Sequence, residues 1–275
     1  MSARGKYKEK SSGEFWAVGL AVGVAAATLS GCGGDKDNGS AAPIVRAAAT
    51  AAPTTPAPDP FPGQSGEQIF MLAANTMKGV DTAIVGITAV EDGVKNQMRV
   101  GMTTSGQCAG HFLVQGGNFE VIGHGKTTYM KGDRAAWTAQ LGARQGGALD
   151  TLLKGRWVKL PADSGLDIQG FCDLSTYVMD LTTSTSSDAT RGKPTTVNGH
   201  GAVPVTGPLD DGGTLTLYVA TEGQPYILTA VRTGPDADTE VLSDFNKPIT
   251  ANPPPPSLTV DISALHQPDG DGFSI

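Results

Sequence analysis

Apolar residues recur at two different spacings along the chain, and the changes between them predict the order of elements. The first helical face consists of Ile69, Leu72, Ala73 and Thr76. Ser65 stands where it can cap the first turn, and Gln68 can reach back to that cap. From Val80 the apolar residues alternate with polar ones, which is typical of strands with one buried face. The pattern therefore predicts a short amphipathic helix followed by strands.

The first run of strands is predicted between glycine-bearing turns, at 80–90, 96–104, 111–115, 118–122 and 126–130. The second strand has the clearest pattern, because Met98, Val100 and Met102 alternate with polar or small residues. Strands so close in sequence favour an antiparallel meander.

Helical spacing returns from Ala135 to Trp157, and a nearly all-apolar helix is predicted over 166–181. Such a helix must be buried against the sheet. A second run of strands follows at 194–198, 201–206, 214–220, 225–233 and 240–245. In this run Leu215, Leu217 and Val219 again give one apolar face.

This order of elements predicts an α+β fold, an open and curved antiparallel sheet with helices covering its concave face. Residues 65–256 are assigned to this domain, and the prolines Pro253–Pro256 end the sheet. Residues 257–275 are assigned to a C-terminal tail, in which 258–265 either adds a final strand or lies along an edge, and the end from Pro268 is expected to be loose.

Residues 1–31 have the pattern of an export signal. Four basic residues, at positions 4, 6, 8 and 10, precede the apolar run Phe15–Leu29, and Leu29-Ser30-Gly31-Cys32 resembles a bacterial lipobox. The alternative is a membrane-spanning helix, but a span needs about 20 apolar residues and this run has 15. The resemblance implies that the mature chain begins at Cys32 and that its thiol carries a diacylglyceryl group.

A tether is predicted between the signal and the domain, over residues 32–64. Six prolines, at positions 43, 53, 56, 58, 60 and 62, occur among Ala, Thr, Gly and Asp, with few large apolar residues. Such a segment cannot build a core, and its proline-spaced half is expected to be stiff and extended.

Charge narrows the partners that the chain can have. The 275 residues carry a formal net charge of −7, and residues 1–31 hold four Lys or Arg against two Asp or Glu, so the remainder has −9. An acidic surface disfavours nucleic acid and offers no polybasic patch to anionic lipid heads. The covalent anchor at Cys32 then remains as the membrane attachment, at the extracytoplasmic face of the cell membrane.

With Cys32 assigned to lipid, Cys108 and Cys172 remain as a pair. A disulfide is the default for two cysteines in an exported domain, and two separately buried thiols are the alternative. A zinc site is not predicted, because this pair and four scattered histidines do not match structural zinc spacing.

The chain resembles the LolA-like half-barrel lipoproteins of actinobacteria, the group that includes LppX and LprG. The likeness rests on the lipobox, the proline-rich tether, the capped helix, and the runs Thr128-Tyr129-Met130-Lys131, Leu153–Leu160 and Phe245-Asn246-Lys247-Pro248-Ile249. It implies a half-barrel around an apolar cavity that holds acyl chains. Two departures, few large aromatic residues in the strands and the Cys108/Cys172 pair, imply a smaller pocket or none.

No catalytic constellation or cofactor site is predicted. Gly125-Lys126-Thr127 resembles part of a phosphate loop, but Glu120 stands where that loop needs glycine. No nucleophile and base can be paired by spacing, so the chain is not expected to be an enzyme.

The candidate ligand-lining residues are those of the two clearest strands: Met98, Val100, Met102, Leu215, Leu217 and Val219. Ordinary core is the other interpretation of the same residues. The sequence therefore predicts an anchored carrier of a hydrophobic ligand such as a lipid, with an anchored adaptor or sensor module without a ligand as the alternative.

Overall fold

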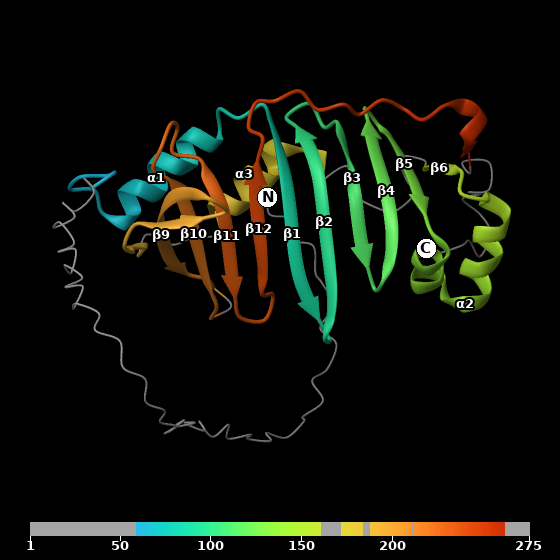
Figure 1. The fold of residues 1–275 in the computed structure, drawn as a ribbon, viewed down its shortest axis with the longest axis horizontal. Helices are drawn as coiled ribbons and strands as arrows, with labels where there is room; N and C mark the ends of the chain where they lie inside the picture. The colour runs from blue at the N-terminus through green and yellow to red at the C-terminus, as the bar shows by residue number, and fades with distance from the viewer. Residues whose placement is uncertain (1–58, 161–171, 184–187, 211, 262–275) are drawn as a thin grey trace, which may run out of the picture. The chain divides into compact units, whose positions relative to one another are not determined.

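A computed structural model describes residues 59–160, 172–183, 188–210 and 212–261 (Figure 1). These residues form one large sheet and three α-helices. The predicted order of helix, strands, helices and strands is confirmed, as is the α+β class. Cys32, most of the predicted tether and the end of the predicted tail lie outside the described residues.

Helix α1 spans Gly66–Met77. The first run of strands is β1 (Thr82–Glu91), β2 (Val94–Thr103), β3 (Cys108–Val114), β4 (Gly117–His124) and β5 (Thr127–Gly132). The central elements are α2 (Arg134–Leu153), β6 (Trp157–Leu160) and α3 (Leu174–Thr183). The second run is β7 (Thr190–Arg191), β8 (Thr195–Val197), β9 (His200–Pro208), β10 (Thr214–Ala220), β11 (Ile227–Thr233) and β12 (Asp238–Ser243). A short 3-10 turn, Pro256–Leu258, leads into β13 (Thr259–Asp261).

The strands lie side by side in the order β13-β6-β5-β4-β3-β2-β1-β12-β11-β10-β9-β7, and β8 pairs with β9 beside this path. Strand β1 joins the two runs, because it pairs antiparallel with β2 on one side and with β12 on the other. The pairing of β13 with β6 is parallel. Within the described residues the sheet is open, with β13 and β7 at its ends.

Local sequence explains the start of α1. The Ser65 side chain accepts a hydrogen bond from the Gln68 backbone, and the Gln68 side chain accepts one from the Ser65 backbone, so the predicted capping box is present. The buried face of α1 is rotated from the prediction, since Leu72 is exposed while Phe70 and Met77 are buried. The periodicity of apolar residues predicted the helix. Which side of its apolar stripe faces inward depends on the strands and the helix that pack against it.

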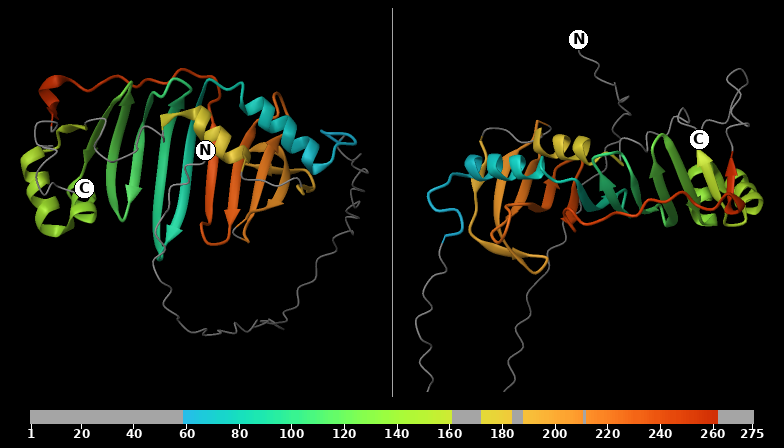
Figure 2. Two further views of the ribbon diagram at one scale, coloured as in Figure 1. Left: turned by 180° about the vertical axis from the view of Figure 1, so that it is seen from behind. Right: turned by 90° about the horizontal axis from the view of Figure 1, so that it is seen from above.

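The three helices pack on one face of the sheet, as the alternation along β4 demonstrates. Gly117 lies against Ala136 of α2, and the Phe119 and Trp137 rings of β4 and α2 meet edge to face at 5.1 Å. Gly123 has the same orientation as these residues and lies against Cys172, just before α3. Figure 2 shows α1 and α3 together over the other half of this face.

One row of inward-facing residues crosses the sheet by register: Leu217, Ala230, Glu240, Ile87, Met98, Phe112 and Phe119. A large hydrophobic core joins α1 and α3 to the strands that run from β4 to β9 in the order of the sheet, and a smaller core lies under α2. The result is a half-barrel sheet whose inner face is apolar except at a few positions.

Two parts of the central region differ from the prediction. Strand β6 follows Gly155, where the sequence pattern suggested the end of a helix, and it pairs with β5 and β13. Helix α2 is bent at Gly142, whose φ of 79° is outside the helical range, because glycine tolerates this conformation. Residues 166–171, the first part of the predicted apolar helix, are outside the described ranges.

The first described residues, 59–64, pack on the domain although the sequence assigned them to the tether. Phe61 is buried in the large core. The Arg191 guanidinium of β7 donates to the backbone carbonyls of Phe61 (2.8 Å) and Gln64 (3.2 Å), and it also pairs with the Asp59 carboxylate. Folded structure therefore begins before Ser65.

Cys108 and Cys172 form a disulfide, with the two sulfurs 2.03 Å apart. It joins β3 to the residue that leads into α3. Gly123 makes room for this bridge, because a Cβ there would lie 2.6 Å from the Cys172 Sγ. The bridge thus attaches the start of α3 to the inner face of the sheet.

We predict that removing this disulfide destabilises the domain. The two cysteines are 64 residues apart, and closing a loop of that size stabilises a fold by about 4 kcal/mol on the chain-entropy estimate. Urea unfolding of a Cys108→Ala/Cys172→Ala variant should therefore show a loss of up to about that amount. The parent protein after reduction is the matched control, and equal stability of its oxidised and reduced forms would contradict the prediction.

Candidate functional site

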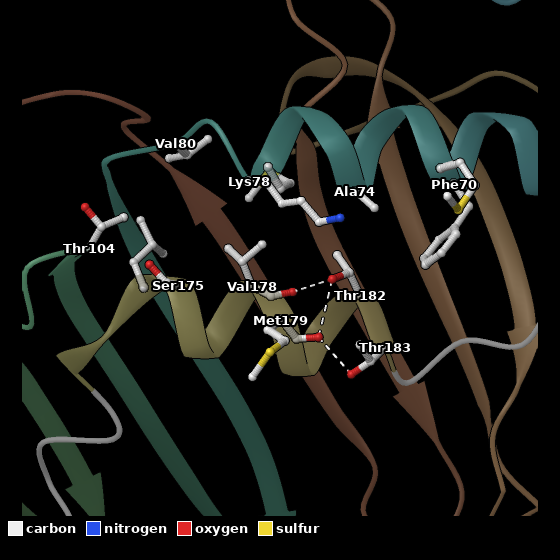
Figure 3. Close-up of a pocket in the computed structure, with 13 residues that line it drawn as sticks. Phe70, Ala74, Lys78, Val80, Thr104, Ser175, Val178, Met179, Thr182 and Thr183 are labelled. Atoms are coloured by element: carbon white, nitrogen blue, oxygen red, sulfur yellow. Dashed lines mark hydrogen bonds between the residues drawn. The ribbon is translucent and has the colours of Figure 1, made fainter.

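A groove of about 550 Å³ separates α1 from α3 (Figure 3). Its α1 side consists of Phe70, Met71, Ala74, Met77 and Lys78, and its α3 side consists of Leu174, Ser175, Val178, Met179, Thr182 and Thr183. Val80, just before β1, and Thr104, just after β2, complete the lining. The volume is within the range of about 300–1,000 Å³ that is usual for small-molecule sites.

Helical spacing places these side chains along the groove. On α1, Phe70, Ala74 and Met77 follow one another at intervals of four and three, so they lie on one face. On α3, Ser175, Val178 and Thr182 follow one another at intervals of three and four, so they form a second continuous face. Two helix faces of this kind, lying side by side, form a groove that runs along the helices.

Most of this surface is apolar, and part of it is accessible. Phe70, Met77 and Val178 are buried at its base. Met71 and Met179 are 51% and 56% exposed, one on each helix. Methionine side chains adapt to varied apolar shapes, so the two sides of the groove can adjust to an occupant.

Lys78 is the charged residue of the lining, and Figure 3 shows its side chain running along α1 with the amine at the edge of the space between the helices. The structure gives it no ion pair with any described residue. The hydroxyls of Thr182 and Thr183 donate to carbonyls of their own helix, to Val178 (2.7 Å) and Met179 (2.8 Å). The lining therefore offers an apolar surface with one cation, and it has no histidine, cysteine or carboxylate.

A polar cluster holds the opposite flank of α3. The Tyr177 hydroxyl donates to Glu240 Oε2 on β12. The Arg232 guanidinium of β11 lies 3.7 Å from Glu240 Oε1 and 3.9 Å from Asp238 Oδ1. Register places Arg232 opposite Asp238, beside the pair of Ala230 and Glu240, so the cluster is on the inner face of the sheet.

Burial changes the acidity of this cluster. It raises the pKa of Glu240, and the negative charge of Asp238 adds to the increase, while the Tyr177 hydrogen bond and Arg232 oppose it. Burial likewise raises the pKa of Asp238. The pKa of the Tyr177 phenol is raised well above its usual value by burial and by the adjacent Glu240 charge.

None of the helices in the described ranges is both long and apolar enough to cross a membrane. Among the residues that the structure describes, no group of three or more His, Cys, Asp or Glu side chains could hold a metal ion.

No family model matches the sequence, and no curated protein matches it either. Solved structures do resemble the fold. LprF from Mycobacterium bovis superposes with a TM-score of 0.50 and 16% identity, over 69% of this chain and 96% of LprF. The lipoprotein LppX from Mycobacterium tuberculosis gives a TM-score of 0.46 at 15% identity, over 68% of this chain and 98% of LppX. A LolA superfamily protein from Nitrosomonas europaea gives 0.27 at 7%, over 66% of this chain and 93% of that protein.

The domain has the half-barrel fold of LprF. The match to LprF at a TM-score of 0.50 carries this conclusion together with the open antiparallel sheet and its helices. Identity this low establishes the fold alone. The fold inferred from the resemblance to LppX and LprG is thus confirmed.

Five of the six predicted ligand-lining residues lie in the packed core of the half-barrel. These are Val100, Met102, Leu215, Leu217 and Val219. Met98 is half-buried and packs against the same core. They face the helices, as the alternation predicts, but the groove lining comes from the helices themselves.

Sequence reasoning missed the accessible methionines and the polar cluster. Met71 stands beside Leu72 in one apolar stripe, and nothing local indicates which one borders a groove. Glu240 did carry a signal, because it shares the inward parity of Leu242 in β12 and is a carboxylate at a core position. Its partners Arg232 and Tyr177 lie on other elements, so their proximity requires the fold.

We predict that Glu240 makes folding stability depend on pH. Its folded pKa is raised above the ordinary value of 4.5, so the folded domain holds the proton more tightly than the unfolded chain. This stabilisation is complete below the ordinary value and is lost as pH rises through the folded pKa. Urea unfolding at a series of pH values should show this loss, and Glu240→Gln, which stays neutral, should reduce it.

The measured quantity is the slope of the free energy of unfolding against pH. Glu222→Gln is the matched control, because Glu222 is exposed. The interpretation fails if both variants show the same pH dependence as the parent protein.

Proposed function

We propose that the protein is a lipid-anchored, extracytoplasmic lipoprotein whose half-barrel domain binds the acyl part of a lipid in the groove between α1 and α3. The observation that carries this proposal is the pair of half-exposed methionines on facing helices over a buried apolar base. Soluble domains rarely leave such side chains accessible along a concave apolar surface without a ligand or partner.

The energetics of an acyl chain fit this groove. Each buried methylene contributes about 0.8 kcal/mol, so about ten methylenes contribute about 8 kcal/mol before the cost of association is subtracted. Lys78 at the rim offers a positive charge to an anionic headgroup. The hydroxyls of Thr182 and Thr183 already donate to carbonyls of α3. Lys78 is the charged group of the lining that is left to bind the headgroup.

The attachment to the membrane rests on Leu29-Ser30-Gly31-Cys32 and the apolar run before it. In this proposal Cys32 bears the lipid, and the segment from 33 to 58 links it to the clamp formed by Asp59 and Arg191. The groove would then be able to reach lipids of the membrane to which the chain is attached.

An adaptor without a bound small molecule is the second candidate. The tight packing of Leu215, Leu217 and Val219, all with no exposed surface, favours it, because the inner face of the sheet is then filled by protein. In that case the groove would accept an apolar helix face of a protein partner. Native mass spectrometry before and after organic extraction distinguishes the two, since a bound lipid adds mass that extraction removes.

We predict that Met179→Asp weakens lipid binding. A carboxylate in the groove would lose hydration against an acyl chain, and affinity for a fluorescent long-chain fatty acid should fall about tenfold or more, equivalent to about 1.4 kcal/mol. The measurement uses the chain from residue 33 onward. Asp at Leu217 is unsuitable, because that side chain is fully buried and the variant would unfold.

Leu152→Asp on α2 is the matched control, because Leu152 is an exposed apolar helix residue (61%) that is not part of the groove. It should bind as the parent does. Equal loss in both variants would indicate a nonspecific effect of charge, and no loss in either would remove the groove as the site.

We also predict that Cys32→Ala prevents the lipid anchor, so that the protein either leaves the membrane or stays as the uncut precursor. Without the thiol no diacylglyceryl group can be attached, and no helix in the described part of the domain could hold the chain in the bilayer. Fractionation of cells should find the variant in the medium or as an uncut precursor. A processed variant that stays in the membrane fraction after a carbonate wash would disprove the anchor.

A further inference from the structure

A second pocket, of about 520 Å³, lies on the convex face of the sheet. Val241, Leu242 and Ser243 of β12 line it. Val241 and Ser243 alternate along the strand with Glu240 and Leu242, whose side chains are buried on the helix-covered face. The sheet therefore separates this pocket from the groove between α1 and α3.

Three segments from different parts of the chain enclose the convex pocket. They are the β8–β9 hairpin, the loop between β10 and β11, and the segment that follows β12. The hairpin is held over the sheet, because Asn198 Nδ2 donates to the Thr229 Oγ1 of β11 at 3.0 Å. The Thr221 backbone N–H donates to the Gly201 carbonyl at 3.0 Å, which joins the hairpin to the loop.

An aromatic pair and two aliphatic residues form the apolar part of this pocket. The Tyr226 and Phe245 rings are stacked, with centroids 4.2 Å apart and planes 21° apart. Leu228 and Val241 lie beside them, and all four side chains are partly exposed. The pocket thus combines a partly exposed aromatic pair with two partly exposed aliphatic side chains.

Polar side chains surround these four residues. His200, Glu222 and Gln224 are exposed at the rim, and the structure gives their side chains no hydrogen bond or ion pair with other described residues. The cation Lys247 is already paired with Asp244, at 2.6 Å. The rim therefore has side-chain donors and acceptors that are available to a ligand. The Glu222 carboxylate is its charged group without an ion-pair partner among the described residues.

We propose that the convex pocket binds a neutral saccharide. A sugar ring has an apolar face that can stack on the Tyr226 and Phe245 surface, and its hydroxyls can donate to Glu222 and bond His200 and Gln224. An acidic ligand would be repelled by the Glu222 carboxylate. No free cation of the lining would offset this repulsion, because Lys247 is paired with Asp244. An acyl chain has no polar group along its length that could bond to this rim.

Fluorescence polarisation with labelled oligosaccharides tests the proposal on the full chain in phospholipid nanodiscs. The probes are neutral oligomers of glucose, mannose, galactose and arabinose, with an oligomer of glucuronic acid as the acidic comparison. At least one neutral oligomer should bind with a dissociation constant of about 1 mM or tighter. The acidic oligomer should bind at least about tenfold more weakly.

The variant Glu222→Ala/Gln224→Ala should weaken saccharide binding about tenfold or more, and both positions are exposed, so the fold is preserved. Glu67→Ala/Gln145→Ala is its matched control, with the same residue types at exposed positions outside the pocket, and it should bind as the parent does. Met179→Asp should leave saccharide binding unchanged, which separates this proposal from that of the lipid groove. Absence of binding by every neutral probe, binding that the rim variant does not alter, or a preference for the acidic probe would overturn the proposal.

Discussion

The inner face of the sheet is apolar over most of its width, and covering it is the constraint on which the rest of the structure depends. Twelve strands in one path, spaced by about 4.8 Å, make a sheet about 50 Å wide. Helices α1 and α3 have 12 and 10 residues and are about 18 and 15 Å long. Helix α2 must therefore cover the β3–β5 end separately, and it does so through Trp137 on Phe119.

The groove forms because the helices that cover this wide sheet are short and lie side by side. Each helix uses one flank of its apolar stripe for the core, through Ile69 on α1 and Leu181 on α3. The flanks that face each other carry Met71 and Met179, which are not part of the core and stay accessible. Three features therefore set the width of the groove: the disulfide at Cys172 before α3, the Tyr177–Glu240 hydrogen bond at its middle, and the core contacts of both helices.

The sequence predicted the features that local physics controls. The capping box at Ser65 and the alternation at Leu215 each depend on neighbours within a few residues, so both appear where expected. Strand β6 was missed because its four residues follow a glycine that also ends helices. The lining of the groove could not be predicted, because residues such as Met179 become a site only when two distant helices are laid side by side.

Strand β12 links the two candidate sites, and the period of two along a strand explains how. Glu240 and Leu242 project to the helix-covered face, where one holds α3 and the other fills the core. Val241 and Ser243 project to the convex face and border the other pocket. A slip of one residue in the pairing of β12 with β1 would exchange the two sets, placing serine in the core and a carboxylate outside. The pairing of Ile84 with Ser243 and of Ile87 with Glu240 therefore positions both sites at once. The polar cluster on the inner face opposes such a slip, because Arg232 and Tyr177 can contact Glu240 in only one register.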